Sequence, residues 1–282
     1  MSAATVSEAL EAAVDAIQAA GSDTARLDAE LLLCHATGWD RTQINSETDL
    51  RLPVGSSREL AAMVRRRVRR EPVAYILGRK GFRRIELIVD RRVLIPRPET
   101  ELLIDVALEV GPRTVLDVGT GSGAIALAVA DEVANARVTA IDTSFDAVRV
   151  TQANAERLGL VDRVDVVLRG ASSLEGGQPD GGGFDLLLAN LPYVSEAEWD
   201  DLPPEIREYE PRDALVAGPK GLEAIEALAE ELAMLAQRPA VVALEMGAAQ
   251  APAVSDLVRA AGYDRIEVRR DLAGLDRVVV GR

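Results

Sequence analysis

The sequence predicts an α/β protein in which a small helical bundle precedes a seven-stranded, mostly parallel sheet. From residue 114 onward, seven short aliphatic or β-branched segments recur, and helical patterns such as 144–158 and 222–235 separate most of them. A glycine-rich turn, Gly119-Thr-Gly-Ser-Gly123, directly follows the first of these segments. This order indicates a doubly wound sheet that binds its ligand at the carboxyl ends of the strands.

Residues 1–78 are expected to form a bundle of short helices. After the expected N-cap Ser7, apolar residues recur at helical spacing, and the set includes Val6, Leu10, Val14 and Ile17. A second apolar segment covers 27–33. A third covers about 57–70 and stops before Pro72, because proline cannot continue a helix. Segments of this spacing predict a small bundle.

The basic cluster of the bundle is Arg65-Arg-Arg-Val-Arg-Arg70. It could contact RNA or an acidic protein partner. The interpretation that we favour is a solvated helix face whose last-turn charges offset the helix dipole. The lone histidine, His35, also lies in this part of the chain, and we assign it no catalytic role.

Residues 79–98 are expected to form a β-hairpin linker. The stretch 82–95 alternates and is rich in β-branched residues, and Pro96-Arg-Pro98 then breaks the chain. The next residues, Glu99, Thr100 and Glu101, could line the entrance of a ligand site. We favour the alternative that Thr100 caps the helix beginning there, with Glu101 near its positive end.

The sheet itself is expected from the alternation of strand and helix patterns. Its strands should be 114–118, 137–141, 163–168, 184–189, 241–245, 265–268 and 277–280. The stretch between the last two is too short for a helical crossover, so we expect these two strands to pair antiparallel. The glycine-rich tract 176–183 is expected to be a loop.

The glycine turn after the first strand is a candidate cofactor site. Glycines let the backbone approach a ligand closely, and the amides at a helix start favour electron-rich groups. The candidate residues here are Gly119, Thr120, Gly121, Ser122 and Gly123. Because Gly119, Gly121 and Ala124 also satisfy the dinucleotide fingerprint, the turn alone leaves both a nicotinamide cofactor and S-adenosylmethionine open.

Two acidic residues adjoin this turn. Asp117 lies just before it, with Val118 between, and could face the ammonium group of an amino-acid moiety. Asp142 ends the next strand, where its carboxylate could accept both hydroxyls of a ribose or could instead cap a helix.

The fourth strand ends abruptly in Asn190-Leu-Pro-Tyr193, which we take as the catalytic segment. It offers the amide oxygen of Asn190, the backbone carbonyl of Leu191 fixed by Pro192, and the aromatic face of Tyr193. These groups could hold a planar NH2 group for attack on an electrophile. Tyr193 could alternatively fill the core. Together with the closing antiparallel pair, this segment favours S-adenosylmethionine over a nicotinamide cofactor.

Composition and charge restrict the class of protein. The single cysteine, Cys34, excludes an intrachain disulfide and fits a reducing compartment. No apolar run approaches the ~18 residues of a membrane span, and the chain start lacks a signal peptide. We therefore expect a soluble cytoplasmic protein with neither a membrane partner nor a metal.

The net charge of −14 is uneven, with −2 on residues 1–78 and −12 on the rest. An acidic catalytic half repels a phosphate backbone, so no stable nucleic acid binding is expected. An acidic cleft would suit a cationic ligand, although the charge could also serve only solubility.

A series of motifs over residues 70–282 resembles the peptide chain release factor glutamine N5-methyltransferases of the HemK or PrmC type. The motifs are Pro72-Val-Ala-Tyr-Ile-Leu-Gly78, Leu94-Ile-Pro-Arg-Pro-Glu-Thr-Glu101, Asp117-Val-Gly-Thr-Gly-Ser-Gly-Ala-Ile125, Asn190-Leu-Pro-Tyr193, Tyr209-Glu-Pro-Arg-Asp-Ala-Leu215, Gly218-Pro-Lys-Gly-Leu222, Leu244-Glu-Met-Gly247 and Asp271-Leu-Ala-Gly-Leu-Asp-Arg-Val278.

The resemblance implies a fold, a cofactor and a substrate. The fold would be a helical bundle over 1–78, a hairpin linker over 79–98 and a Rossmann-like class I methyltransferase domain over 99–282. The cofactor would be S-adenosylmethionine. The substrate would be the glutamine in the Gly-Gly-Gln loop of bacterial class 1 release factors, which the bundle would help to hold.

Two residues depart from the family pattern. Leu191 replaces the first proline of the Asn-Pro-Pro-Tyr motif, and Ala171 stands where the family usually has an aspartate near the adenine. Three alternatives therefore stay open. They are glutamine methylation of a ribosomal protein, a cofactor-binding protein with weakened catalysis, and adenine-N6 methylation, which the acidic surface disfavours.

Overall fold

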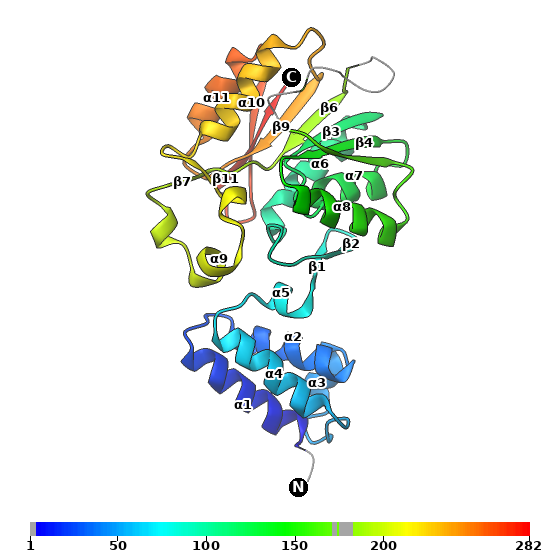
Figure 1. Cartoon of the computed structure of the whole chain (residues 1–282), viewed down its shortest axis with the longest axis vertical. Helices are drawn as coiled ribbons and strands as arrows, with labels where there is room; N and C mark the ends of the chain where they lie inside the picture. The colour runs from blue at the N-terminus through cyan, green and yellow to red at the C-terminus, as the bar shows by residue number, and fades with distance from the viewer. Residues whose placement is uncertain (1–3, 171–173, 175–182) are drawn as a thin grey trace. The chain divides into compact units, whose positions relative to one another are not determined.

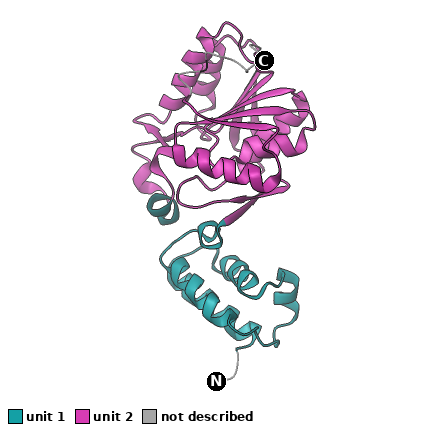
Figure 2. Ribbon diagram, turned by 45° about the vertical axis from the view of Figure 1, so that its right-hand side comes forward, with its two compact units in different colours: residues 1–78, 203–209 teal, residues 79–202, 210–282 magenta. Residues whose placement is uncertain are grey.

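The computed structural model describes residues 4–170, 174 and 183–282, and it divides into two compact units. Unit 1 contains residues 1–78 together with 203–209, and unit 2 contains 79–202 together with 210–282 (Figure 2). Ala171 and, except for Gly183, the expected loop 176–183 lie outside the described residues.

Unit 1 is helical, as expected from the sequence. Its helices in the first 78 residues are α1 (Val6–Ala19), α2 (Ala25–Thr37), α3 (Arg41–Ser46), α4 (Ser56–Val68) and α5 (Val73–Leu77). The three longer helices match the expected patterns, whereas α3 and α5 were missed because segments of six and five residues carry almost no periodic signal.

The expected N-cap of α1 was wrong by two residues. Thr5 caps the helix, because its hydroxyl accepts from the Glu8 amide at 3.3 Å and the Glu8 carboxylate accepts from the Thr5 amide at 2.9 Å. Ser7 instead donates its hydroxyl to Glu11. The reciprocal Thr5–Glu8 pair is a capping box, which satisfies two amides that a helix start leaves without partners.

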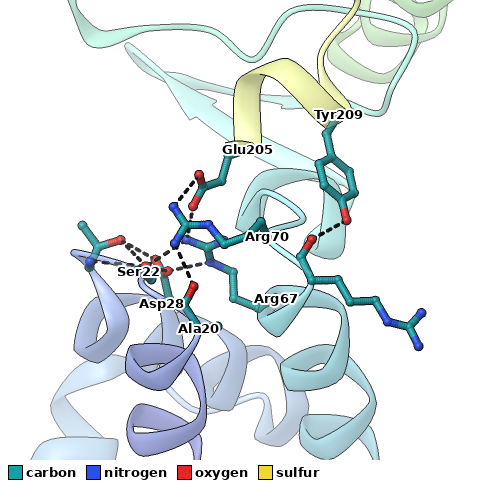
Figure 3. A network of polar contacts seen from close by, with 9 residues as sticks. Ala20, Ser22, Asp28, Arg67, Arg70, Glu205 and Tyr209 are labelled. Carbon is teal, nitrogen blue, oxygen red and sulfur yellow. Dashed lines mark hydrogen bonds and ion pairs between the residues drawn. The ribbon is translucent and has the colours of Figure 1, made fainter. Parts of the chain in front are cut away.

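A short helix from the second half of the chain, α9 (Pro204–Tyr209), completes unit 1. Its Glu205 accepts from two arginines at the end of α4, from Arg67 at 2.8 Å and from Arg70 at 2.7 Å (Figure 3). Arg67 also donates to Asp28 of α2 at 2.7 Å. The Arg67 side chain is 5% exposed, so the solvated-face interpretation of the basic cluster is wrong for this residue.

Unit 2 begins with a hairpin, which a 3-10 turn and a helix follow. Strand β1 (Arg79–Phe82) pairs antiparallel with β2 (Ile85–Ile88), and a 3-10 turn η1 (Pro98–Thr100) leads into α6 (Glu101–Val110). The hairpin was expected, but its second strand ends at Ile88 instead of continuing to Ile95.

The central sheet of unit 2 has seven strands in the order β10-β11-β9-β6-β3-β4-β5, which confirms the predicted fold class. The strands are β3 (Thr114–Val118), β4 (Arg137–Asp142), β5 (Val164–Leu168), β6 (Leu186–Ala189), β9 (Val241–Glu245), β10 (Ile266–Arg270) and β11 (Asp276–Gly281). The last two pair antiparallel, as expected, and β11 is also antiparallel to β9.

Helices cover both faces of this sheet (Figure 1). One face carries α6, α7 (Ala124–Glu132) and α8 (Phe145–Leu158), and the other carries α10 (Glu223–Met234) and α11 (Ala251–Ala260). A short parallel pair, β7 (Val194–Ser195) and β8 (Val216–Gly218), flanks the segment that contains α9.

The direction of the strand order changes at β3, which has β4 on one side and β6 on the other. In open α/β sheets, such a switch point opens a crevice at the carboxyl ends of the strands. Val118 pairs with both Ile141 and Ala189, and Ala189 pairs with Leu244. The residues that follow these four positions therefore lie along one edge of the sheet.

Candidate active site

The loop after β3 is held against the end of β4 by backbone hydrogen bonds. The amides of Gly119 and Thr120 donate to the carbonyl of Ile141 at 2.9 and 3.0 Å. Gly119 has φ of 76°, and a Cβ placed there would lie 3.1 Å from Cδ2 of Leu191. The turn therefore needs glycine for its backbone conformation and for close packing against the catalytic segment.

Asp117 lies at the end of β3 and is fully buried. Its Oδ2 accepts from the Thr120 hydroxyl at 2.7 Å and from the Ala126 amide at 3.2 Å. Its Oδ1 has no hydrogen-bond partner among the described residues. Burial raises the pKa of Asp117 to about 7. An unpaired carboxylate oxygen beside a glycine turn fits a cationic ligand group, which would restore its missing partner.

Asp142 orders the same turn from the end of β4. Its Oδ2 accepts from the Gly121 amide at 2.9 Å, and its Oδ1 accepts from the Ser144 amide at 2.8 Å. The cap of α8 is Ser144, whose hydroxyl accepts from Ala147, so the capping alternative for Asp142 is wrong. Each oxygen of an ionised carboxylate can accept a second hydrogen bond, which leaves room for ligand hydroxyls.

The catalytic segment follows β6. Asn190 donates from Nδ2 to the hydroxyl oxygen of Thr100 at 3.1 Å. Leu191 is 8% exposed and belongs to the hydrophobic core under α10 and α11, so its side chain has taken a packing role. Burial raises the pKa of Tyr193 to about 12, and the phenol is therefore neutral at physiological pH.

Gln250 braces the backbone of this segment and was missed from the sequence. Its Nε2 donates at 3.0 Å both to the carbonyl of Tyr193 and to that of Gly221, and its Oε1 accepts from the Gly247 amide at 2.9 Å. A glutamine five residues beyond a strand end carries no sequence signal for such a role, because the two carbonyls that it holds lie 29 and 57 residues away in the chain.

Thr100 does not have the role that we favoured for it. It occupies the N-cap position of α6, but its side chain makes no capping hydrogen bond to any residue that the structure describes. Its hydroxyl oxygen instead accepts from Nδ2 of Asn190 at 3.1 Å, and the Thr100 side chain lowers the pKa of Glu245, which ends β9. Glu101 accepts from the amide of Arg83 in the hairpin turn at 3.1 Å.

Glu210 joins two of the sequence motifs. Its Oε1 accepts from Nη2 of Arg97 at 2.6 Å, and its Oε2 accepts from the Ile95 amide at 3.0 Å. The Glu210 side chain is only 2% exposed. The segment before α6 is thus fixed to the chain that returns from α9, and both belong to unit 2.

The lone histidine, His35, lies in unit 1 with its Nε2 3.8 Å from the Glu59 carboxylate. Within the described ranges, no group of three or more histidine, cysteine, aspartate or glutamate side chains could hold a metal ion. In the same ranges, no helix combines the length and the apolar character that crossing a membrane requires.

Two family models match the chain. Residues 8–78 match the PrmC N-terminal domain, and residues 115–209 match a methyltransferase domain. The first match lies in unit 1. The second contains the glycine turn, Asp142 and the segment that follows β6.

Curated relatives match over almost the whole length. A release factor glutamine methyltransferase of Caulobacter vibrioides is 40% identical over 98% of this chain and 96% of its own length. One from Rhodopirellula baltica is 38% identical over 98% and 95%, respectively. Among solved structures, the hMettl16 catalytic domain in complex with a MAT2A 3′UTR hairpin has a TM-score of 0.55 at 17% identity, covering 69% of this chain and 75% of that one. This likeness supports the Rossmann-like fold of unit 2.

Proposed function

The chain belongs to the release factor glutamine methyltransferases, and we propose that it methylates the side-chain nitrogen of the glutamine in the Gly-Gly-Gln motif of bacterial class 1 release factors. The observation that carries this proposal is the juxtaposition of Asn190 and Leu191 with the glycine turn at one edge of the sheet. The reaction would take place in the cytoplasm, where release factors act.

S-adenosylmethionine is the methyl donor of this family and supplies an electrophilic methyl group. The residues that would hold it are Asp117, Gly119, Thr120, Gly121, Ser122, Gly123 and Asp142, with Asn190 at the boundary to the substrate. In this assignment, Oδ1 of Asp117 faces the ammonium group and Asp142 accepts from the ribose hydroxyls. Asp117 supports the assignment because that oxygen otherwise stays buried without a partner in the described structure.

The catalytic problem is that a carboxamide nitrogen is a poor nucleophile, because its lone pair is delocalised into the carbonyl group. In our proposal, the side-chain oxygen of Asn190 and the backbone carbonyl of Leu191 accept the two amide hydrogens of the substrate. These bonds favour a tetrahedral nitrogen and direct its lone pair at the methyl group. Holding the reactants in this geometry supplies much of the rate enhancement.

Pro192 and Tyr193 complete the substrate clamp. Pro192 keeps Leu191 extended, so that the Leu191 carbonyl keeps its direction although the family's first proline is absent. Tyr193 would stack on the flat substrate amide, and its neutral phenol adds no charge there. No base is needed before the attack, since the nitrogen becomes acidic on methylation and then loses a proton to water.

We assign residues 1–78 as the release factor-binding bundle, 79–98 as a linker and 99–282 as the methyltransferase domain. The partner would be a protein rather than a nucleic acid. The net charge of −14 supports this choice, because an acidic protein repels a phosphate backbone.

The test is the intact mass of a purified class 1 release factor after incubation with this protein and S-adenosylmethionine. We expect the gain of one methyl group, mapped by fragmentation to the glutamine of the Gly-Gly-Gln loop. A release factor with that glutamine changed to alanine should gain nothing. Methylation of a ribosomal protein, with the release factor unchanged, would contradict the proposed substrate. Cofactor binding without turnover on either protein would contradict the proposed activity.

A further inference from the structure

The carboxylate of Glu245 is buried at the carboxyl edge of the sheet, and the proposed methyl transfer gives it no direct part. Glu245 ends β9 and is 1% exposed. Strand β9 is the neighbour of β6, with Leu244 opposite Ala189, so Glu245 lies level with Asn190. Burial of a carboxylate costs free energy unless hydrogen bonds compensate it, and Oε2 of Glu245 has no partner in the described part of the chain.

Thr100 connects this carboxylate with the proposed substrate clamp. The Thr100 side chain lies near Glu245 and lowers the pKa of that carboxyl group against the effect of burial, and Nδ2 of Asn190 donates to the hydroxyl oxygen of Thr100 at 3.1 Å. A hydroxyl has one proton to donate. When Thr100 gives this proton to the carboxylate, its oxygen can only accept from Asn190. The NH2 end of the Asn190 amide then has to face Thr100.

We propose that Glu245 and Thr100 are positioning residues, which fix the side-chain amide of Asn190 so that its oxygen is presented to the substrate amide. The oxygen and nitrogen of an asparagine amide lie on opposite sides of one planar group and exchange places when that group turns over. Only the oxygen can accept an amide hydrogen of the substrate glutamine. This inference rests on the proposed function, because it assigns two further residues to the same site.

The charges around Glu245 come from several elements of unit 2. Glu99 of η1 contributes negative charge, whereas Arg97 and Arg277 contribute positive charge. The phenol of Tyr193, whose pKa the charge of Glu245 helps to raise, also lies near the carboxylate. Burial has the largest effect and raises the pKa of Glu245 to about 7. The carboxylate therefore changes its protonation state close to physiological pH.

Protonation of Glu245 would reverse the hydrogen bonds. The neutral carboxylic acid can donate to Thr100, whose own proton is then free for the oxygen of Asn190. The Asn190 amide can turn over and present its NH2 group to the substrate, where it cannot accept a hydrogen. The orientation that supports catalysis therefore loses population as the pH falls below about 7.

The first experiment separates positioning from general structural support. We expect Thr100→Val to lower kcat about tenfold to a hundredfold, while the KM for the release factor and the Kd for S-adenosylmethionine change less than about threefold. Thr100→Ser keeps the hydroxyl and should restore most of kcat. The matched control is Thr37→Val, which removes a hydroxyl that donates to the Leu33 carbonyl at 2.8 Å in unit 1. An unchanged kcat in Thr100→Val, or no rescue by serine, would overturn the proposal.

The pH profile tests the part played by Glu245. In the unmodified protein, kcat at saturating substrates should fall below about pH 7. Glu245→Gln cannot gain a proton, while its amide oxygen can still accept from Thr100, so its kcat should stay flat through this range. An identical acid limb in both proteins would show that Glu245 does not control the clamp.

A third measurement does not depend on turnover. The chain contains four asparagines, so selective nitrogen-15 labelling gives four side-chain amide signals, and Asn190→Ala identifies the one of interest. We expect this signal to titrate near pH 7 in the unmodified protein but not in Glu245→Gln. Titration without any methylation of a release factor would refute the proposed function and leave the positioning role intact. Methylation without this titration would refute the positioning role alone.

Discussion

Leu191 packs its side chain directly against Gly119, so the segment proposed to hold the substrate contacts the turn proposed to hold the cofactor. A Cβ on Gly119 would lie 3.1 Å from Cδ2 of Leu191 and 3.6 Å from the carbonyl oxygen of Asn190. In a close-packed interior, the space beside Gly119 is therefore filled by the segment after β6, and a side chain at position 119 would displace that segment. The leucine that replaces the family's proline thus acts as a spacer between the two halves of the site.

We predict that Gly119→Ala weakens binding of S-adenosylmethionine at least tenfold. The alanine has to adopt φ of 76°, which is unfavourable for a residue with a Cβ, and its methyl group presses on Leu191. The measurement is the dissociation constant by titration calorimetry. Gly111→Ala is the matched control, because it imposes a similar φ of 61° but its Cβ meets nothing within 4 Å in the described structure. Both variants should lose about 1 kcal/mol of stability, so equal cofactor affinities would contradict the contact.

Leu191→Pro should separate stability from catalysis. The leucine side chain is in the core. Its replacement by the smaller proline removes buried apolar atoms and should lower the free energy of unfolding by about 1–3 kcal/mol. The backbone carbonyl stays, so kcat should be equal or higher. Urea unfolding and initial rates measure the two effects. A hundredfold loss of kcat would mean that the site is adapted to leucine.

Asn190→Ala should remove most of the activity and keep cofactor binding. The variant loses an acceptor that acts on the reacting nitrogen, and removal of one such group costs about a hundredfold or more in kcat. The dissociation constant for S-adenosylmethionine should change less than about threefold. Single-turnover rates with a release factor provide the measurement, and unchanged turnover would exclude the amide clamp.

Cofactor affinity should depend on pH through Asp117. Burial raises its pKa in the folded protein to about 7, above the unfolded value near 3.8. Because the folded state holds the proton more tightly, this residue destabilises the protein increasingly as the pH rises from about 4 to 7. A ligand ammonium group beside Oδ1 favours the ionised form, so binding should release a proton.

Affinity for S-adenosylmethionine should consequently fall, by up to tenfold per pH unit, as the pH drops below about 7. Calorimetry in buffers of different ionisation enthalpy would detect the released proton. In Asp117→Asn, this pH dependence should disappear together with part of the affinity. If the substituted protein keeps the full dependence, another group is responsible.

Glu205→Ala should destabilise unit 1. It removes the carboxylate that pairs with Arg67 and Arg70 (Figure 3). Arg67 keeps Asp28 as a partner, so we expect a loss of about 1–3 kcal/mol, measured by urea unfolding. The control is Asp256→Ala, which breaks an exposed pair with Arg259 and should cost under about 1 kcal/mol. Equal effects would mean that the buried network contributes no more than a surface pair.

The sheet could be predicted because its signal is local. Each buried strand is a short apolar run between polar turns, and the short gap before β11 reveals the antiparallel ending. The cap of α1 was also within reach, since Thr5 has a glutamate three residues later whereas Ser7 does not. The presence of two hydroxyl residues before the same apolar pattern made the choice ambiguous.

The support around the site could not be predicted, because its partners lie far apart in the sequence. Thr100 and Asn190 are 90 residues apart, and a threonine before a helical pattern equally suits a cap. Arg67 was expected on a solvated helix face because it lies within a run of arginines. Its burial depends on Glu205, which is 138 residues away.

The position of α9 in unit 1 means that neither unit corresponds to a contiguous piece of the gene. The chain passes between the units at three points. Recombination that exchanged only the first 78 codons would leave Arg67 and Arg70 facing a foreign helix. To keep the ion pairs of Glu205 with the two arginines, residues 203–209 have to be inherited together with residues 1–78. We expect covariation between Glu205 and the two arginines to be visible among relatives, as a record of this shared inheritance.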